Sequence, residues 1–372
     1  MHFHPRVSFL LLLLRTAKKF DRRQSETRYF SPAAVRSILV ISATALGDTV
    51  MSTAAMGALR ARYPAARITA LIHQSYVDLF RRMPELDTVI PYHGGYRGFV
   101  RTALALRKAK PDVALILHGN EPQATPLAYF SGARFLFKLP NNNPFRFLLS
   151  NHDPLIARAQ IGHGMTQRLQ TAALADASVD GARMRLPVDG DAIAAVDAFL
   201  SGQGITPSHT VIGLQVGASS RSRMWPAEKF VELARGVSAR VPLARFVLSG
   251  SAAESAYCHE IARAIGNAAV VAAAAVSVAQ LPALVRRMRL LVSGDTGTMH
   301  VAVAVDTPVV ALFAVSNPKM SGPAYDLDRH VVIHRPCADP GIRSKSDDPT
   351  CIGRIPVTDV LAAVETILGR AA

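Results

Sequence analysis

The sequence predicts two doubly wound α/β domains, and three observations support this fold class. Short, largely apolar runs alternate with longer segments of helical periodicity from Arg36 onward. Apolar runs joined by helices are typical of parallel strands that are covered on both faces. The alternation weakens after residue 140 and restarts near residue 211, and 372 residues with 49% apolar content suffice for two buried cores.

The expected elements follow this pattern in order. In the first domain, strands are expected at 38–42, 68–73, 88–91 and 113–118, with helices at 48–62, 74–83 and 96–110. Loop signals rich in Asn and Pro follow at 141–144 and 151–154. A helix is then expected from 165 to about 175, and residues 181–207 form a connection with one short helix. In the second domain, strands are expected at 211–216, 245–249, 290–293 and 309–313, with helices at 227–238, 254–265 and 278–287.

These elements divide the chain into five parts. Residues 1–35 form a basic and apolar N-terminal arm, 36–185 a first Rossmann-like domain, 186–208 a linker, and 209–355 a second Rossmann-like domain. A final helix within 356–372 is expected to pack back across the domain boundary. The two domains are expected to face one another across a cleft, where ligands of such folds bind.

The charge is strongly positive, which indicates an anionic partner. The chain has 42 Lys and Arg against 27 Asp and Glu, a net +15, and residues 1–36 hold eight basic side chains against two acidic ones. Nucleic acid, an acidic membrane surface or a phosphorylated substrate would each fit. No run of Lys and Arg interleaved with aromatic residues occurs in the body of the chain. This argues against nucleic acid.

The N-terminal arm has an apolar run from Val7 to Leu14, followed by Arg15, Lys18 and Lys19. The run is too short to span a bilayer, which takes about 20 residues, and no clear small-residue cleavage site follows it. We expect the arm to lie on an anionic membrane surface. A poor signal peptide or a disordered extension without function are the alternatives.

The three cysteines, Cys258, Cys337 and Cys351, predict no disulfide framework and lack the CxxC spacing of a zinc site. A reducing cytoplasm fits this cysteine content best.

The segment from Gly294 to His300 reads as strand, tight turn and helix, and it is the most informative stretch of the chain. It places the backbone N–H groups of Thr296 and Gly297, the Asp295 carboxylate and the His300 imidazole at one helix N-terminus. Such a corner binds phosphate without a metal, because free N–H groups and the helix dipole favour an anion. The alternative is an ordinary turn with a capping Asp.

Five blocks in this order resemble glycosyltransferase family 9, the bacterial heptosyltransferases of lipopolysaccharide core assembly. They are residues 38–51 (ILVISATALGDTVM), 63–68 (YPAARI), 112–120, 217–226 with its Arg-Met-Trp-Pro, and 295–300. The end of the chain, 337–352, is also similar to the C-terminus of heptosyltransferases. The resemblance covers roughly residues 36–368 and implies a GT-B fold. It also implies an acceptor bound mainly by the first domain and a nucleotide-sugar bound by the second.

Asp48 is the predicted catalytic base. It follows the first strand at the start of a helix, on the sheet edge where α/β ligands bind, and Gly47 lets the chain turn there. Sugar transfer needs a group that removes the proton of the acceptor hydroxyl, and a carboxylate within hydrogen-bond reach can do so. Asp48 also matches the position of the base proposed for the family. The alternative is that Asp48 only caps the helix.

The remaining candidates bind the two substrates. Arg223 matches a position where the family often has Lys, and a cation there would hold the pyrophosphate. Ser219 and Ser220 are candidate phosphate contacts, and Glu254 resembles the acidic residue that hydrogen-bonds a ribose. His163 and Arg168 resemble a family block that faces the acceptor.

Other chemistries lack their motifs. There is no GxxxxGK[ST] and no GxGxxG, and the Asp326-Leu327-Asp328 triplet falls in a loop, where we interpret it as surface charge and not as a metal-binding DxD. We expect no metal and no cofactor.

Together these features predict an inverting GT-B glycosyltransferase that moves a heptose from ADP-heptose to a lipopolysaccharide core acceptor. The expected place is the cytoplasm, peripheral at the inner face of the cytoplasmic membrane, where the lipid-anchored saccharide acceptor and the membrane are both anionic. Departures from the family pattern, among them Thr49 and residues 135–139, keep alternatives open. These are another nucleotide-sugar donor with a surface polysaccharide acceptor, a nucleotide-sugar epimerase, and a membrane-associated GT-B protein without catalysis.

Overall fold

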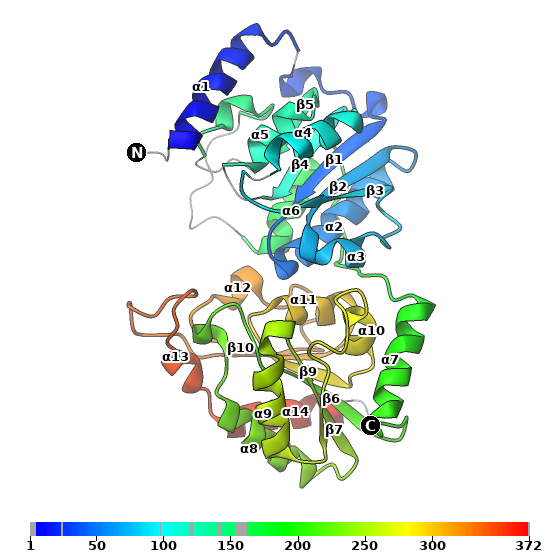
Figure 1. Cartoon of the computed structure of the whole chain (residues 1–372), viewed down its shortest axis with the longest axis vertical. Helices are drawn as coiled ribbons and strands as arrows, with labels where there is room; N and C mark the ends of the chain where they lie inside the picture. Colours follow the sequence, from blue (N-terminus) through cyan, green and yellow to red (C-terminus); the bar gives the residue numbers. More distant parts are fainter. Residues whose placement is uncertain are drawn as a thin grey trace. The chain divides into compact units, whose positions relative to one another are not determined.

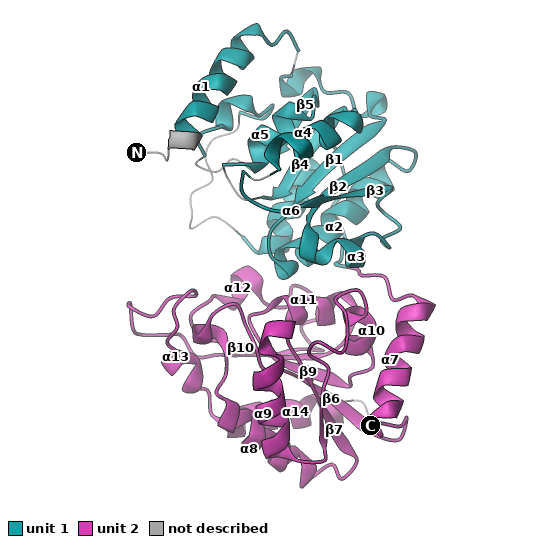
Figure 2. Cartoon of the chain, viewed as in Figure 1, with its two compact units in different colours: residues 1–184 teal, residues 185–372 magenta. Residues whose placement is uncertain are grey.

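The computed structural model describes residues 5–23, 25–96, 98–119, 122–139, 143–152 and 162–370. The chain divides into two compact units, residues 1–184 (unit 1) and 185–372 (unit 2) (Figure 2). Each unit contains one parallel sheet between helices. The expected loop signals at 141–142 and 153–154 lie outside the described residues.

Unit 1 contains a five-stranded parallel sheet in the order β3-β2-β1-β4-β5 (Figure 1). Its strands are β1 (Ser37–Ser42), β2 (Arg67–His73), β3 (Thr88–Tyr92), β4 (Val113–His118) and β5 (Phe135–Lys138). The first four confirm the expected strands to within a residue. β5 was missed, because its four residues include a lysine and are too short to show a pattern. β1 pairs with β2 on one side and β4 on the other, so its carboxyl end lies at the centre of the sheet edge.

The helices of unit 1 cover both faces of this sheet. The helices are α1 (Pro5–Phe20), α2 (Leu46–Arg62), α3 (Val77–Phe80), α4 (Phe99–Lys108), α5 (Ala124–Phe130) and α6 (Gly164–Ala173). α2 and α6 pack on one another and on β4. The opposite face, through Leu39 and Ile41 of β1, packs against a cluster formed by α1, α4 and α5. Side chains of a strand alternate between faces, so each strand contributes to both layers.

The structure corrects the prediction of a separate N-terminal arm. Leu14 of α1 is fully buried, and Val7 and Leu10 are about nine-tenths buried, all within the core of unit 1. Two short 3₁₀ turns, Thr27–Tyr29 and Pro32–Ala34, then lead into β1. The apolar run that sequence reasoning separated from the first domain is therefore part of its hydrophobic core. No helix in the described part of the chain is long and apolar enough to cross a membrane.

Unit 2 contains a six-stranded parallel sheet in the order β11-β10-β9-β6-β7-β8. Its strands are β6 (Thr210–Gln215), β7 (Ala244–Ser249), β8 (Ala269–Val271), β9 (Leu290–Gly294), β10 (Val309–Phe313) and β11 (Val331–His334). The expected strands correspond to β6, β7, β9 and β10. The two missed strands lie at the edges of the sheet, where β8 has three residues in an alanine-rich segment and β11 is only half-buried.

The helices of unit 2 are α7 (Gly190–Gly202), α8 (Ala227–Ser238), α9 (Ser255–Ile265), α10 (Leu281–Arg286), α11 (Gly297–Ala304), α12 (Pro318–Ser321), α13 (Thr350–Gly353) and α14 (Val357–Gly369). α14 packs on α8, β10 and β11, and it buries Val360, Val364 and Ile367 in the core of unit 2. The expectation that this helix packs back across the domain boundary is wrong, because its apolar face is used within its own unit.

Candidate active site

Asp48 lies in the first turn of α2, directly after the central strand β1. The helix begins after Ala45, whose side chain cannot cap it, and the contacts of the Asp48 side chain among the described residues are with Thr44, His118 and Arg168. The Asp48 side chain is 30% exposed at the carboxyl end of the sheet. A carboxylate that is neither buried nor used as a helix cap is available for other contacts.

Arg168 of α6 holds the Asp48 carboxylate. Its Nη2 donates to Asp48 Oδ1 at 2.8 Å, and its Nη1 donates to the Gly164 carbonyl at 2.6 Å. The Arg168 side chain is 3% exposed. Burial lowers the pKa of this guanidinium, and the Asp48 carboxylate opposes the shift. A buried arginine without a nearby anion would be costly, so the two side chains depend on each other. Sequence reasoning placed Arg168 toward an acceptor anion, whereas the structure pairs it with Asp48.

His118, the last residue of β4, and Thr44 complete this cluster. Thr44 Oγ1 is hydrogen-bonded to His118 Nδ1 at 2.7 Å, and His118 Nε2 lies 3.6 Å from Asp48 Oδ1. Burial, and the positive charge of Arg168, lower the pKa of His118 to about 4, so the ring is neutral near pH 7. Sequence reasoning assigned no role to either residue. His118 could have been found, since it ends a predicted strand beside β1, where ligands of parallel sheets gather.

Gly47 and His163, the two other residues of unit 1 predicted from the sequence, lie on the helices that carry Asp48 and Arg168. Gly47 is buried within α2 and its φ is not positive, so the expectation that glycine is needed there for a tight turn is wrong. His163 is the N-cap of α6, and its Nδ1 accepts a hydrogen bond from the backbone N–H of Met165 at 3.1 Å. It therefore orders the first turn of the helix that carries Arg168.

In unit 2, Arg223 lies in a 3₁₀ turn (Arg221–Arg223) after β6, and its guanidinium is surrounded by acceptors. Nη1 donates to the Asp295 carbonyl at 3.2 Å and to Asp295 Oδ2 at 3.4 Å, and Nε donates to Ser220 Oγ at 3.3 Å. Nη2 donates to Ser219 Oγ. The structure thus brings together four of the residues that sequence reasoning assigned to donor binding.

The segment after β9 forms the turn and helix that the sequence predicts. Thr296 is the N-cap of α11, and its Oγ1 accepts from the backbone N–H of Met299 at 3.4 Å. His300 is 3% exposed, so it lies inside unit 2 and not on the helix surface. A Cβ at Gly294 would lie 2.4 Å from the carbonyl oxygen of Arg223, a distance that real Cβ atoms do not reach. Glycine at this position lets the Arg223 turn lie directly against the end of β9.

Glu254 lies near the same edge but has a local partner. It completes a capping box with Ser251, in which Glu254 Oε2 accepts from the Ser251 backbone N–H at 2.7 Å and from its hydroxyl at 2.8 Å. Its carboxylate also lies against Gly217, where a Cβ would be 2.1 Å from Glu254 Oε1. Glu254 therefore orders the loop after β7, and its role toward a ribose stays a prediction.

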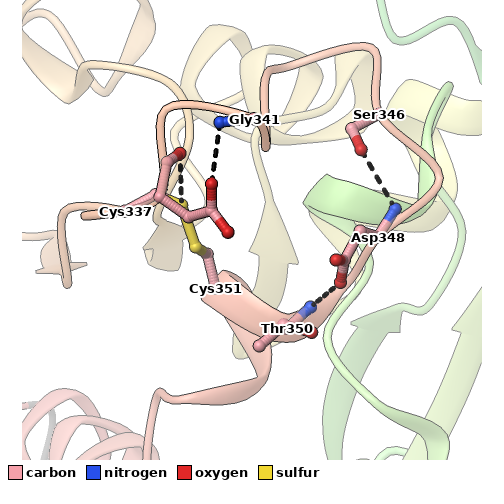
Figure 3. The surroundings of a disulfide bond; sticks show 7 residues. Cys337, Gly341, Ser346, Asp348, Thr350 and Cys351 are labelled. Atoms are coloured by element: carbon pink, nitrogen blue, oxygen red, sulfur yellow. Dashed lines mark hydrogen bonds between the residues drawn. A yellow bond between two sulfur atoms is a disulfide. The ribbon is translucent and has the colours of Figure 1, made fainter.

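A disulfide joins Cys337 and Cys351, whose Cα atoms are 5.3 Å apart (Figure 3). The sequence predicts no disulfide framework and does not predict this single bond, because the spacing of the two cysteines along the chain gives no sign of their proximity in the fold. Hydrogen bonds order the enclosed loop: Gly341 N–H donates to Asp339 Oδ1 at 2.7 Å and Thr350 N–H donates to Asp348 Oδ1 at 2.8 Å (Figure 3). Cys258 is free and buried.

The disulfide-closed loop contacts the turn that carries Arg223. Ser220 Oγ donates to the Ser344 carbonyl at 2.6 Å, and Ser222 N–H donates to the Ser346 carbonyl at 3.1 Å. Ser220, which also accepts from Arg223, is therefore held from both sides. Asp326 and Asp328 lie in the segment before β11, where the Asp326 carbonyl accepts from Arg329 N–H and the Asp328 carbonyl from Arg370. Among the described residues, no group of three His, Cys, Asp or Glu side chains is arranged to hold a metal.

A comparison with protein families supports the prediction made from the sequence. The model of glycosyltransferase family 9 (heptosyltransferase) matches residues 169–348, which include Arg223, Asp295 and His300. This match, together with the curated heptosyltransferase relatives, supports the predicted family and indicates that the chain is a glycosyltransferase.

This chain is matched over most of its length by curated relatives and by solved structures. It is 26% identical over 302 residues to lipopolysaccharide heptosyltransferase 2 of Salmonella typhimurium and 27% identical over 303 residues to that of Escherichia coli, in each case 77% of this chain and 85% of the relative. Among solved structures, a family 9 glycosyltransferase from Veillonella parvula superposes with a TM-score of 0.77 at 21% identity, over 90% of this chain and 97% of the other. E. coli ADP-heptose lipopolysaccharide heptosyltransferase II superposes with a TM-score of 0.75 at 23% identity, over 90% and 100%. The GT-B fold class is confirmed.

Proposed function

We propose that this enzyme transfers a heptose from ADP-heptose to a lipopolysaccharide core acceptor, with inversion and with Asp48 as the general base. The observation that carries the proposal is the arrangement of the Asp48 carboxylate, which is bound by the buried Arg168 and not used as a helix cap. The relatives named lipopolysaccharide heptosyltransferase 2 support the choice of sugar and acceptor, and a similar structure named for ADP-heptose supports the donor.

The two oxygens of Asp48 have different surroundings, which suits a base. Oδ1 accepts from Arg168 at 2.8 Å, so the guanidinium fixes the orientation of the carboxylate. Within the described residues, Oδ2 has one polar contact, a long hydrogen bond of 3.5 Å from Thr44 Oγ1. Oδ2 is therefore the oxygen that would take the proton of the acceptor hydroxyl as that hydroxyl attacks the anomeric carbon. One direct displacement at this carbon inverts its configuration.

The neutral His118 fits this role for Asp48. With its pKa lowered to about 4, the imidazole brings no second positive charge beside the carboxylate near pH 7. Its hydrogen bond with Thr44 at 2.7 Å orients both side chains at the sheet edge. Arg168 and His118 act here as positioning residues, because each contacts Asp48 and neither is placed as the proton acceptor.

The departing nucleoside diphosphate gains negative charge, and unit 2 offers two groups that would stabilise it without a divalent ion. Arg223 provides a guanidinium, which forms charge-assisted hydrogen bonds to phosphate oxygens. The N-terminus of α11 provides the backbone N–H of Gly297 and the helix dipole. Ser219 and Ser220, which already accept from Arg223, would hold the guanidinium in place.

The charge distribution supports an anionic acceptor on unit 1. Residues 1–184 contain 24 Lys and Arg against 11 Asp and Glu, whereas residues 185–372 contain 18 against 16. Thirteen of the fifteen net charges therefore belong to unit 1. A phosphorylated, lipid-anchored saccharide at the inner face of the cytoplasmic membrane would be attracted to this unit.

A donor screen tests the proposal. We expect ADP and ADP-heptose to raise the unfolding temperature, with little response to UDP or GDP, because a ligand that binds only the folded state stabilises it. Transfer from ADP-heptose to a water-soluble core saccharide is then expected to persist in EDTA. Stabilisation by UDP- or GDP-sugars instead would favour the alternative of another donor and a surface polysaccharide acceptor. Loss of activity in EDTA with rescue by manganese would contradict the metal-free mechanism.

A further inference from the structure

α1 carries two apolar stripes on different sides. One stripe is packed into unit 1 through Val7, Leu10 and Leu14. The other points outward, and its side chains are 70%, 67%, 45% and 80% exposed at Phe9, Leu12, Leu13 and Phe20. Their spacing places these four on one side of the helix. Among the described residues, ten large hydrophobic side chains are exposed, and four of them belong to this one helix.

The outward stripe is held rigidly on unit 1. Directly after α1, Arg23 Nε donates to Asp21 Oδ1 at 2.8 Å, and Arg23 Nη1 donates to the Ala133 carbonyl at 2.7 Å. Tyr129 of α5 donates to Asp21 Oδ2 at 3.1 Å. Burial alone would raise the pKa of Asp21, but the hydrogen bonds from Arg23 outweigh it and lower the pKa to about 2. The Asp21 carboxylate therefore stays ionised near neutral pH. Asp21, Arg23 and Tyr129 together form a clamp that fixes the end of α1 to unit 1.

Basic side chains border the outward stripe. Arg15 and Lys19 are exposed and four residues apart, so they lie along one edge of the stripe, and the exposed Arg22 follows the helix. α4, which covers the same face of the sheet as α1, repeats the pattern: Val100 and Leu104 are 69% and 57% exposed, and Arg107 at its end is exposed.

We propose that the outward stripe of α1 is a docking surface for an anionic lipid bilayer. Phe9, Leu12, Leu13 and Phe20 would enter the boundary between headgroups and acyl chains, and Arg15 and Lys19 would contact lipid phosphates. A second copy of the chain fits this surface poorly, because pairing α1 with itself would bring the same basic side chains and two strongly positive units together. This surface is separate from the donor and acceptor chemistry proposed above, and it does not depend on it.

The test uses the full-length protein with vesicles of phosphatidylcholine alone and of phosphatidylcholine with 30% phosphatidylglycerol. We expect binding to the anionic vesicles that weakens with salt. Phe9→Gln/Leu12→Gln/Phe20→Gln should weaken it about 100-fold, because three apolar side chains no longer enter the bilayer. Arg15→Gln/Lys19→Gln should weaken it about 30-fold at low salt, which is two contributions of about 1 kcal/mol.

Control variants remove exposed apolar or basic side chains from unit 2. Leu243→Gln/Leu327→Gln and Arg235→Gln/Arg263→Gln remove exposed apolar and basic side chains there, and both should bind as wild type does. All four variants should keep the wild-type unfolding temperature and turnover on a water-soluble acceptor. Equal binding of wild type to both vesicles, or wild-type binding by the stripe variant, would overturn the proposal. So would a dimer in sedimentation that disappears in the stripe variant while its vesicle binding remains. Lack of turnover in wild type would instead contradict the proposed function and leave the vesicle result standing.

Discussion

Units 1 and 2 share a parallel α/β architecture, yet each presents the opposite member of an ion pair at its sheet edge. In unit 1, Arg168 is 3% exposed and Asp48 is 30% exposed. In unit 2, Asp295 is 12% exposed and Arg223 is 21% exposed. Each pair thus leaves more accessible the charge that the proposed chemistry needs, a base in unit 1 and a cation for phosphate in unit 2. The same fold therefore exposes a negative group in one unit and a positive group in the other, according to which member of the ion pair is more buried.

The strongest test of this comparison removes the exposed carboxylate of unit 1. Asp48→Asn should lower kcat about 1,000-fold, within the range for loss of a general base, while the Kd for ADP-heptose stays near wild type because Arg223 is unchanged. Rapid-mixing kinetics and donor titration measure the two quantities. The matched control is Asp78→Asn, an exposed surface carboxylate of the same unit that pairs with Arg81. A parallel loss of donor binding would show that Asp48 is structural and would break the comparison.

The next effect concerns stability and should be confined to unit 2. Cys337→Ser/Cys351→Ser opens a loop with a sequence separation of 14, and loop-closure entropy predicts a loss of about 3 kcal/mol of unfolding free energy. Differential scanning calorimetry with and without dithiothreitol measures it. Cys258→Ala keeps the disulfide and should retain the wild-type response to the reductant. A reductant effect of equal size in the double variant would rule out this disulfide as its source.

Removing the exposed cation of unit 2 should affect donor binding first. Arg223→Ala should raise the Kd for ADP-heptose about 30-fold, since hydrogen bonds to charged groups contribute about 1.5–3 kcal/mol. Arg223→Lys, which keeps the charge, should lose less, and Arg221→Ala in the same 3₁₀ turn should bind donor as wild type does. Calorimetric titration measures these constants. An unchanged Kd for ADP-heptose in Arg223→Ala would contradict the proposed role of Arg223 in donor binding, and with it the contrast between the two ion pairs.

The smallest expected effect concerns the acid stability of unit 2. Burial lowers the pKa of His330 to about 4, below the ordinary value near 6.5, so the unfolded chain takes up a proton first as the pH falls. Stability is then lost from about pH 6.5 toward pH 4, and by about 1.4 kcal/mol at pH 5.5. His330→Asn, whose Oδ1 can still accept from Val309 N–H, should remove this loss. Unfolding midpoints at pH 5.5 and 8 measure it, and an identical pH dependence in the variant would contradict the assignment.

Much of the fold could be predicted from the sequence, because fully buried parallel strands are apolar without interruption. Val113–His118 and Val309–Phe313 were predicted to the residue for that reason. The missed strands, such as Ala269–Val271, are short edge elements. Their strand conformation depends on hydrogen bonds to a neighbouring strand and not on an apolar pattern of their own. The helix at Pro5–Phe20 was missed because its two apolar stripes give an almost continuous apolar run, which has no single period.

The candidate site was predictable only in part. Asp48 and Arg223 follow strands, so the rule that ligands bind at the carboxyl ends of parallel strands finds them. The pairing of Arg168 with Asp48 joins residues 120 positions apart, and no local pattern encodes such a contact. The same applies to the Cys337–Cys351 bond and to the loop carbonyls that hold Ser220, since these depend on how the end of the chain packs on unit 2.

The clamp between Asp21, Arg23 and Tyr129 affects how the enzyme would encounter a lipid-anchored acceptor. A helix joined by a flexible linker would only tether the enzyme, leaving it free to tumble. Because α1 is fixed to unit 1, docking on a bilayer would also set the tilt of the sheet edge that carries Asp48. An acceptor anchored in the same leaflet would then be found by lateral diffusion at a constant height. The rate of encounter would then depend more on the density of acceptor in the membrane than on the affinity of the enzyme for free acceptor in solution.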